Sequence, residues 1–306
     1  MAKTTAGFIY NHLNKDAKSL AERLCKIADS KGVLTWILSA EQDVQARQKL
    51  ASVGMLISVG GDGTLLRTAR LALKNDIPVL GINMGKVGFM TELAVDEAAQ
   101  KLPYYLAGKG WVEQRSVLEG RILNHTKKAQ GPGHSAVQLE SPILAVNDFV
   151  IGREALSRVI YVEAGIDGTR YATYKGDGVI VASATGSTGY ALGAGGPILH
   201  PQSKDIVVQP ISPHLSMAHP LVLPGDSVVR LRVYSDQGAA MSIDGQIELD
   251  LVSGDELTVK RSSKVVRFLR GRDPSYFYES LTKRLAVPEL PFDPFIEGGK
   301  RGKARK

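Results

Sequence analysis

This sequence contains almost no cysteine and no long apolar run, and both absences narrow the class of protein. Cys25 is the single cysteine of the 306-residue chain, so no internal disulfide can form. No segment reaches the ~20 consecutive apolar residues of a membrane-spanning helix. The first residues, MAKTTAGFIY, also lack the apolar run of a signal peptide. We therefore expect a cytoplasmic protein with no membrane contact.

Two common phosphate-binding motifs are missing as well. The dinucleotide fingerprint G-x-G-x-x-G does not fit Gly60-Gly61-Asp62-Gly63, because the second glycine directly follows the first. The Walker motif fails at GINMGKV, which is one residue too short and has Val87 where Ser or Thr is required. The six histidines show no metal-ligand spacing, so a zinc site is not expected. Phosphate handling in this chain would need another device.

Positive charge is concentrated at the C-terminus. The net charge is +7, and five basic residues lie in the last nine positions, GGKRGKARK. Without them the rest of the chain carries only about +2, which does not favour a nucleic-acid partner. We interpret residues 298–306 as a disordered basic tail and expect no nucleic-acid partner, with an acidic partner as the lesser alternative.

The first hundred residues have the pattern of an α/β domain. The composition, 43% hydrophobic and 23% charged, is that of a globular protein, and the length suits about two domains of ~150 residues each. The predicted strands lie at 7–10, 33–38, 55–59 and 77–82, and the predicted helices at 15–30, 41–50 and 64–73. This alternation indicates a parallel sheet with helices on its faces.

From about residue 110 the chain changes to short alternating runs separated by turn signals. Examples are Gly176-Asp177-Gly178, Pro224-Gly225-Asp226 and Ser253-Gly254-Asp255. They predict an all-β, sandwich-like domain. The predicted organisation is an α/β domain with a parallel sheet at 1–108, a β-rich domain at 109–272 and a further segment at 273–297, helical over 276–284.

A strand, a glycine-rich turn and a helix start follow one another in VGMLISVGGDGTLLRTA. Glycines let the backbone approach a ligand closely, and unpaired N–H groups at a helix N-terminus favour anions. Gly60–Thr64 is therefore a candidate phosphate cradle. Asp62 needs its own explanation, because a carboxylate repels phosphate. Three roles are open for this carboxylate. It binds a metal ion, it accepts a proton from an attacking hydroxyl, or it only caps the helix that begins near Thr64.

A second glycine- and hydroxyl-rich segment is KGDGVIVASATGSTGYALGAGGPILHP, from Lys175 to Pro201. The hydroxyls between Thr185 and Thr188 can read a nucleobase edge or a ribose, and Tyr190 can cover a flat ring. The alternative is a glycine-rich turn between packed elements.

Polar residues also interrupt apolar surroundings at two further places. Asn147-Asp148 lies inside the apolar run 143–151, and a buried polar pair is costly without partners. The pair therefore binds a ligand or forms a structural polar network. Asp177, between two glycines, is likewise a ligand group or a turn residue.

Together these motifs resemble the NAD kinase family. That family carries GGDG followed by Thr or Asn, then an Asn-Asp or Asn-Glu pair, then a segment similar to DGxIVxTPTGSTAYxLSAGGPI. The matching residues here are Gly60–Thr64, Asn147-Asp148, Asp177–Ile198, 81–90 and 244–246. The resemblance extends from about residue 5 to residue 286.

The resemblance implies ATP-dependent phosphorylation of the 2′-hydroxyl of the adenosine ribose of NAD, which yields NADP and ADP. It implies a divalent metal ion, Mg²⁺ or Mn²⁺, bound with ATP, while NAD is the substrate. It also implies an α/β domain followed by an NAD-binding β domain, with a C-terminal segment that packs back on the first domain. A homodimer or homotetramer is expected, because a partner subunit can complete the site.

The resemblance also implies the site residues. Asp62 corresponds to the proton acceptor. The positions that correspond to ligand contacts are Asp62, Gly63, Arg67, Asn147, Asp148, Arg158, Lys175, Asp177, Thr185, Thr188, Gly189, Tyr190, Ala191, Leu192, Gly193 and Gln246. The sequence departs from the family pattern at Ser183-Ala184 in place of Thr-Pro, at Gly189 in place of Ala, and at Gly193 in place of Ser. The missing hydroxyl at Gly193 removes a hydrogen bond of roughly 0.5–1.5 kcal/mol.

Two other functions stay open at this point. A lipid kinase or sugar-phosphate kinase shares the Gly-Gly-Asp-Gly theme, although the TGSTGYALGAGG segment disfavours the sugar-phosphate class. A non-catalytic NAD(P) sensor would bind nucleotide tightly without releasing ADP, and the intact Asp62 argues against it.

Overall fold

The computed structural model describes residues 5–85, 88–123, 142–154, 158–214 and 219–285. Residues 1–271 form one compact unit, and a second unit begins at Arg272. The described part of the second unit contains helix α6 (Tyr276–Arg284), as predicted. The packing of residues 273–297 on the first domain stays a prediction, and the predicted tail lies outside the described residues. Among the described helices, none is both long and apolar enough to span a bilayer.

The N-terminal part is a parallel sheet with helices between its strands, as predicted. Neighbouring strands all pair in parallel, in the order β5-β4-β3-β1-β2. The elements are β1 (Thr5–Tyr10), α1 (Lys15–Ser30), β2 (Leu34–Ser39), α2 (Asp43–Lys49), a 3₁₀ turn (Leu50–Ser52), β3 (Val53–Gly60), α3 (Asp62–Ala72), β4 (Val79–Asn83), β5 (Leu93–Ala94) and α4 (Val95–Leu106). The sequence patterns had not predicted β5 or α4.

Alternation along the strands explains why helices cover both faces of this sheet. Phe8 and Ile57 are fully buried against α1 and α4, whereas their neighbours Ile9 and Leu56 are fully buried on the side of α2 and α3. Successive side chains of a strand point to opposite faces. Central strands that are apolar on both faces therefore need helices above and below, and the sequence supplies them between the strands.

The described residues from Trp111 to Arg270 contain most of the strands, and these strands form two sheets. A six-stranded antiparallel sheet has the order β13-β12-β11-β8-β15-β16. A single apolar cluster between the sheets joins side chains of both. The elements are β6 (Trp111–Leu123), β7 (Ile143–Ala145), β8 (Asp148–Arg153), β9 (Ile160–Ile166), β10 (Thr169–Gly176), β11 (Gly178–Ala182), a 3₁₀ turn (Gly186–Thr188), α5 (Tyr190–Gly193), β12 (Ile206–Ile211), β13 (Leu221–Leu223), β14 (Val228–Tyr234), β15 (Ala239–Ile243), β16 (Ile247–Leu251) and β17 (Glu256–Arg270).

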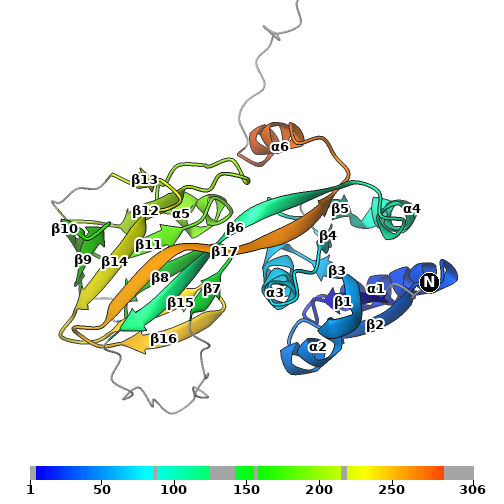
Figure 1. Ribbon diagram of the computed structural model, residues 1–306, viewed down its shortest axis with the longest axis horizontal. Coiled ribbons are helices and arrows are strands. Elements are labelled where there is room, and N and C mark those ends of the chain that lie inside the picture. Colours follow the sequence, from blue (N-terminus) through cyan, green and yellow to red (C-terminus); the bar gives the residue numbers. More distant parts are fainter. Residues whose placement is uncertain (1–4, 86–87, 124–141, 155–157, 215–218, 286–306) are drawn as a thin grey trace, which may run out of the picture. The chain divides into compact units, whose positions relative to one another are not determined.

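The sheets of the two predicted domains are not separate. The end of β17 pairs in parallel with β4 at Phe268 and Val79, so one eleven-stranded sheet continues from the β-rich part into the α/β part. Figure 1 shows β17 and its antiparallel neighbour β6 as two long ribbons that extend from one part to the other. The predicted boundary at 108/109 stays a prediction. The shared sheet brings the C-terminal end of β17 next to the α/β part.

Candidate functional site

The glycine-rich turn joins the carboxyl end of β3 to the start of α3. The helix begins at Asp62 with Gly61 as N-cap, two residues earlier than predicted. A Cβ at Gly61 or Gly63 would meet no described atom within 4 Å, so the backbone at this helix start is open to a ligand. Unpaired N–H groups and the helix dipole favour an anion there. The turn therefore retains the features of a phosphate cradle.

Asp62 does not cap its own helix, so the capping alternative is wrong. Its Oδ2 accepts a hydrogen bond from the N–H of Phe89 at 2.7 Å, and its Oδ1 accepts one from the N–H of Met90 at 3.2 Å. The approach is close at Gly88, where a Cβ would lie 2.1 Å from Oδ1 of Asp62. The segment 88–90 thus surrounds one side of the carboxylate, and the side chain is not fully buried.

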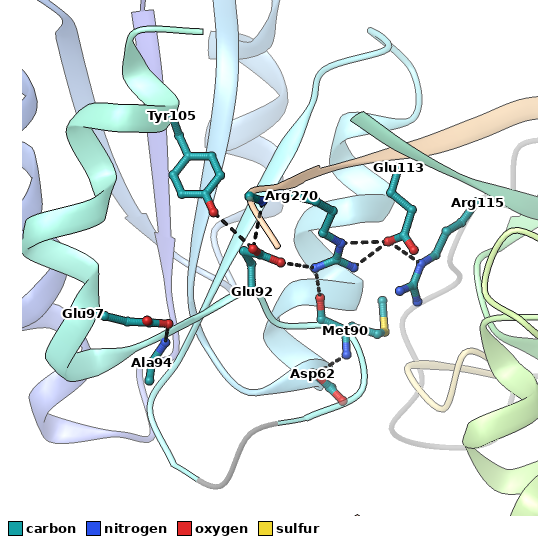
Figure 2. A network of polar contacts seen from close by, with 10 residues as sticks. Asp62, Met90, Glu92, Ala94, Glu97, Tyr105, Glu113, Arg115 and Arg270 are labelled. Carbon is teal, nitrogen blue, oxygen red and sulfur yellow. Dashed lines mark hydrogen bonds and ion pairs between the residues drawn. The ribbon is translucent and has the colours of Figure 1, made fainter. Parts of the chain in front are cut away.

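A buried charge network lies behind segment 88–90, and Figure 2 shows its members converging on Arg270. Arg270 donates from Nη1 to the Met90 carbonyl oxygen at 2.8 Å and from Nε to Oε2 of Glu113 at 2.8 Å. Its Nη1 also lies 3.4 Å from Oε2 of Glu92. Glu113 accepts a further bond from Nε of Arg115 at 3.0 Å. Two guanidinium groups and two carboxylates therefore balance each other in a buried position.

The charges of this network change the pKa values of its members. Burial acts to raise the pKa of Glu113, but Arg115 and Arg270 outweigh it and hold that pKa below its ordinary value. Burial lowers the pKa of Arg115 to about 10, and Arg270 acts in the same direction while Glu113 opposes it. The negative charge of Asp62 also acts on Arg115, so the network is electrically coupled to the candidate catalytic side chain. The sequence patterns had not singled out any of these four network residues.

The Asn147-Asp148 pair is held through its backbone by Asp244. Oδ1 of Asp244 accepts from the N–H groups of Asn147 at 2.7 Å and Asp148 at 3.2 Å, and Oδ2 accepts from that of Val146 at 3.1 Å. The Asp244 N–H returns a bond to the Asp148 carbonyl oxygen at 3.0 Å. Asp244 adopts the left-handed backbone conformation, with φ of 55°. The backbone of the pair is therefore part of a structural polar network.

Asp148 and Asp244 form a buried pair of carboxyl groups. Burial, with a contribution from Asp244, raises the pKa of Asp148 to about 7. Burial also raises the pKa of Asp244, while Arg70 and the three amide donors act against that rise. The pKa of Asp244 is raised despite Arg70 and these donors, so both carboxyl groups of the pair favour the protonated form more than exposed aspartates do. A carboxyl group with a raised pKa at a candidate ligand site is typical of functional positions.

The turn after β11 packs directly on the backbone of Asn147. Ser183 donates from Oγ to the Val146 carbonyl at 2.6 Å, and its N–H donates to the Asn147 carbonyl at 2.8 Å. A Cβ at Gly186 would lie 2.2 Å from the Asn147 carbonyl oxygen, which explains the glycine there. Among the described residues, Oδ1 of Asn147 and Oγ1 of Thr185 are buried and meet no hydrogen-bond partner. Such orphaned acceptors mark a place where a ligand can bind.

Two contacts join these turns to the helix that begins at Asp62. Nε2 of Gln246 donates to the Gly63 carbonyl oxygen at 3.1 Å, and Nε of Arg70 lies 3.7 Å from Oδ2 of Asp244. The turn of residues 244–246 thus contacts Gly63 in the first turn of α3 and Arg70 in its last turn. Of the predicted residues, Gln246 contacts Gly63, and Asn147 and Asp148 are held by Asp244, two residues before Gln246.

The residues that follow Thr185 line the same turn with differing exposure. Oγ1 of Thr188 donates to the Thr185 carbonyl at 3.2 Å, and a Cβ at Gly189 would lie 3.8 Å from Nδ2 of Asn147. Tyr190 is 51% exposed, and Ala191 is fully buried. Leu192 is half-buried, and Gly193 is exposed with no described atom within 4 Å of a Cβ. The turn that packs on Asn147 therefore carries the Thr188 hydroxyl, the exposed Tyr190 ring and the exposed Gly193.

Four predicted residues occupy other surroundings. Arg67 donates from Nη1 to the Ala40 carbonyl at 3.0 Å. Asp177 pairs with Nε of Arg153 at 2.8 Å, and the Lys175 ammonium lies 5.6 Å from the centre of the Tyr161 ring. Arg158 is exposed. Asp177 stands at the opposite end of β11 from Ser183, roughly 20 Å away at about 3.3 Å per residue, so a single chain does not gather the whole predicted set.

The fold and this arrangement are those of a nucleotide-handling protein: an open helix N-terminus beside a carboxylate, at the end of a parallel sheet. Comparison with known proteins narrows the class. Residues 6–109 match the family model of the ATP-NAD kinase N-terminal domain, and residues 146–271 match that of the ATP-NAD kinase C-terminal domain. The chain belongs to the NAD kinase family.

Individual relatives agree with this assignment. An NAD kinase of Dehalococcoides mccartyi is 44% identical over 279 residues, which cover 91% of this chain and 95% of the relative. An NAD kinase of Chloroflexus aurantiacus is 37% identical over 277 residues, which cover 90% and 96%.

Solved structures share the fold. A yeast NADH kinase, crystallised with NADH, matches with a TM-score of 0.79 at 21% identity and covers 98% of this chain and 90% of its own. An Archaeoglobus fulgidus NAD kinase, in complex with ATP, matches with a TM-score of 0.71 at 24% identity and covers 93% and 100%.

Proposed function

We propose that this chain is an NAD kinase, which transfers the γ-phosphate of ATP to the 2′-hydroxyl of the adenosine ribose of NAD and yields NADP and ADP. The main structural support is the connection between the helix that begins at Asp62 and the turn that bears Asn147 and Asp148. The carboxylate of Asp62 lies at an open helix start, and Gln246 and Asp244 link that helix to the turn that bears Asn147 and Asp148. A phosphate cradle and a dinucleotide site thereby become neighbours.

Asp62 is the residue that we assign to proton transfer. A ribose hydroxyl is a weak nucleophile, and a positioned carboxylate that accepts its proton accelerates such a reaction by about 10²–10⁴-fold. As the oxygen–phosphorus bond forms, the bond from the γ-phosphorus to the β-phosphate oxygen breaks and ADP leaves. The two amide donors at 89 and 90 hold the carboxylate in one orientation for this task.

Asn147, Asp148 and the turn from Thr185 to Gly193 are the groups that we assign to NAD. The orphaned oxygens of Asn147 and Thr185 offer acceptors for ribose hydroxyls or an exocyclic amine. Asp148, with its raised pKa, supplies a carboxyl proton as a donor near neutral pH. Tyr190 presents an exposed ring on which a base can stack.

We further propose that a divalent metal ion accompanies ATP. Among the described residues, no cluster of three or more His, Cys, Asp or Glu side chains is placed to hold one. A nucleotide-bound Mg²⁺ needs only one or two protein carboxylates in addition to phosphate oxygens, and Asp62 is such a group. When bound, the ion would neutralise charge on the transferred phosphoryl group.

A homo-oligomer would explain the separated residues Arg158, Lys175 and Asp177. They match ligand-contacting positions of the family, yet Asp177 pairs with Arg153, Lys175 lies over the Tyr161 ring and Arg158 is exposed. A second copy of the chain could present them to the first. We propose a homodimer or homotetramer on this ground, while the cytoplasmic location stays a prediction.

Incubation of the purified chain with ATP, Mg²⁺ and candidate acceptors tests the function. We expect NADP to form with NAD, in step with ADP. Phosphorylation of a lipid or a sugar phosphate, with NAD inert, would instead assign the chain to the related kinases. Tight NAD(P) binding without any ADP release would indicate a sensor.

A further inference from the structure

The orientation of Asp62 depends on segment 88–90, which itself belongs to no helix or strand. Both carboxylate oxygens receive their hydrogen bonds from the amides of Phe89 and Met90. These residues lie between β4, which ends at Asn83, and β5, which begins at Leu93. An irregular segment needs other contacts to hold its N–H groups in a fixed direction. The backbone of Met90 therefore depends on a contact from another part of the chain.

Arg270 is the group that holds this segment from behind. Its Nη1 donates to the Met90 carbonyl oxygen at 2.8 Å, while the Met90 N–H points to Asp62. Figure 2 shows the carbonyl and the N–H of Met90 directed to opposite sides, one toward Arg270 and the other toward Asp62. A single residue thus relays the position of the guanidinium to the carboxylate.

Arg270 is itself held rigidly. It is the last residue of β17, pairs across the strands with Trp111 of β6, and is 8% exposed. Oε2 of Glu113 accepts from its Nε at 2.8 Å and from its Nη2 at 2.7 Å. Glu92 accepts from the N–H of Gly271 at 2.9 Å, from the Tyr105 hydroxyl at 3.1 Å and, more weakly, from Arg270. Because Glu113 and Glu92 both bind the planar guanidinium group, the side chain of Arg270 has little conformational freedom.

We propose that Arg270 is a positioning residue for the transfer reaction and acts on Asp62 through the backbone of Met90. The proposal rests on the proposed function, in which Asp62 accepts the proton. Arg270 touches neither ATP nor NAD in this scheme. Its contribution is to keep the Phe89 and Met90 amides aimed at the carboxylate, and through them to keep the carboxylate aimed at the hydroxyl.

The test is a double-mutant cycle between Arg270→Lys and Asp62→Asn on the full chain. Lysine keeps the charge but has no planar fork to reach Glu113 and Met90 together. We expect Arg270→Lys to lower kcat about 10- to 100-fold, a loss that misplacement of a catalytic group by an ångström can cause, with KM for NAD and ATP nearly unchanged. In the Asp62→Asn background the same change should lower kcat less than about twofold, because its target is already gone.

Amide hydrogen exchange supplies a readout that does not depend on activity. In the wild-type chain we expect Phe89 and Met90 to be protected by Asp62, and Arg270→Lys should speed their exchange while the exchange of β3 and β4 stays unchanged. The matched control is Arg267→Lys on the same strand, whose partner is Asp76 at 2.9 Å. It should leave both kcat and exchange at 89–90 as they were.

The outcomes separate this proposal from the proposed function. If Asp62→Asn abolishes turnover while Arg270→Lys leaves kcat intact, or lowers it equally in both backgrounds, Arg270 does not act through Asp62. If Asp62→Asn itself keeps full activity, the assignment of Asp62 is wrong and Arg270 loses its target. Should Arg270→Lys not fold, Arg270→Met with Glu92→Gln removes one charge of each sign and leaves the Glu113–Arg115 pair, and the same criteria apply.

Discussion

Hydrogen bonds from backbone amides to a carboxylate hold both sides of the candidate site, but the carboxylate has a different role on each side. At Asp62 the carboxylate is the reactive group, and backbone amides from 88–90 hold it. At Asn147-Asp148 the backbone belongs to the ligand-binding residues, and the carboxylate of Asp244 holds it from within the protein. The carboxylate that accepts the amide hydrogen bonds is thus the proposed reactive group at Asp62 and a structural group at Asp244.

Burial explains which role each carboxylate has. Asp244 is 6% exposed and has Arg70 nearby, so its loss strands three amide donors and a cation inside the protein. Asp62 is only partly buried, so water can reach the two amides that it would leave behind. We therefore expect damage at Asp62 to appear in catalysis and damage at Asp244 to appear in folding and NAD affinity.

The largest effect is expected for Asp62→Asn. The amide keeps the size of the side chain but cannot take the proton, so kcat should fall about 10²–10⁴-fold. The unfolding midpoint and the Kd for NAD should stay near those of the wild type. Steady-state kinetics and thermal unfolding measure the two halves of this prediction, and a variant that keeps full turnover would remove Asp62 from the mechanism.

Asp244→Ala should lower the stability of the fold, in contrast to Asp62→Asn, which should lower kcat. Loss of a buried, hydrogen-bonded charge partner costs about 3–5 kcal/mol, because the amides of 146–148 and Arg70 lose their acceptor. Urea unfolding would measure the loss, and NAD binding should weaken in the fraction that folds. The matched control is Asp226→Ala in an exposed turn. A stable Asp244→Ala that loses only kcat would break the comparison.

The carboxyl group of Asp148 makes the stability of the folded chain depend on pH. Its pKa is raised to about 7 in the folded chain, above the unfolded value of about 3.9, so the folded state binds more protons than the unfolded state between these pH values. Stability from this group is therefore present at low pH and decreases as pH rises from about 4 to about 7.

The variant Asp148→Asn cannot ionise and should flatten this dependence. Nearly two pKa units, each worth about 1.4 kcal/mol, separate pH 5 from the folded pKa, so we expect the variant to gain about 2.6 kcal/mol relative to the wild type on going from pH 5 to pH 8. Unfolding free energies at the two pH values measure it, with Asp226→Asn as the control. Equal pH slopes in variant and wild type would show that Asp148 is charged in the folded state.

The smallest effect is expected for Gln246→Leu. This change removes one hydrogen bond between the two sides, from Nε2 to the Gly63 carbonyl, worth about 0.5–1.5 kcal/mol. The unfolding free energy should fall by that amount, with little change in kcat. A drop in kcat as large as that of Asp62→Asn would show that the link between the sides, rather than Asp62 alone, limits the reaction.

Much of the fold followed from periodicity. Apolar runs at 7–10, 55–59 and 77–82 became β1, β3 and β4, because buried parallel strands leave continuous apolar stretches in a sequence. Helix α4 was missed although Ala98, Leu102 and Tyr105 have the i, i+4, i+7 spacing of a helix face, because a proline at 103 normally argues against a helix interior. The two-residue error at α3 arose because Asp62 and Gly63 resemble turn residues, yet both lie inside the helix.

The sequence by itself determined the parallel α/β part, the β-rich part and the motifs at Asp62, Asn147-Asp148 and Thr185, because local pattern and glycine chemistry are written in consecutive residues. Only the tertiary structure decided what holds these motifs. Arg270 reaches Met90, and Asp244 reaches Asn147, across long stretches of chain. The partner of a buried charge is chosen by sheet pairing and packing, and β17 reaches the α/β sheet only once the chain has folded.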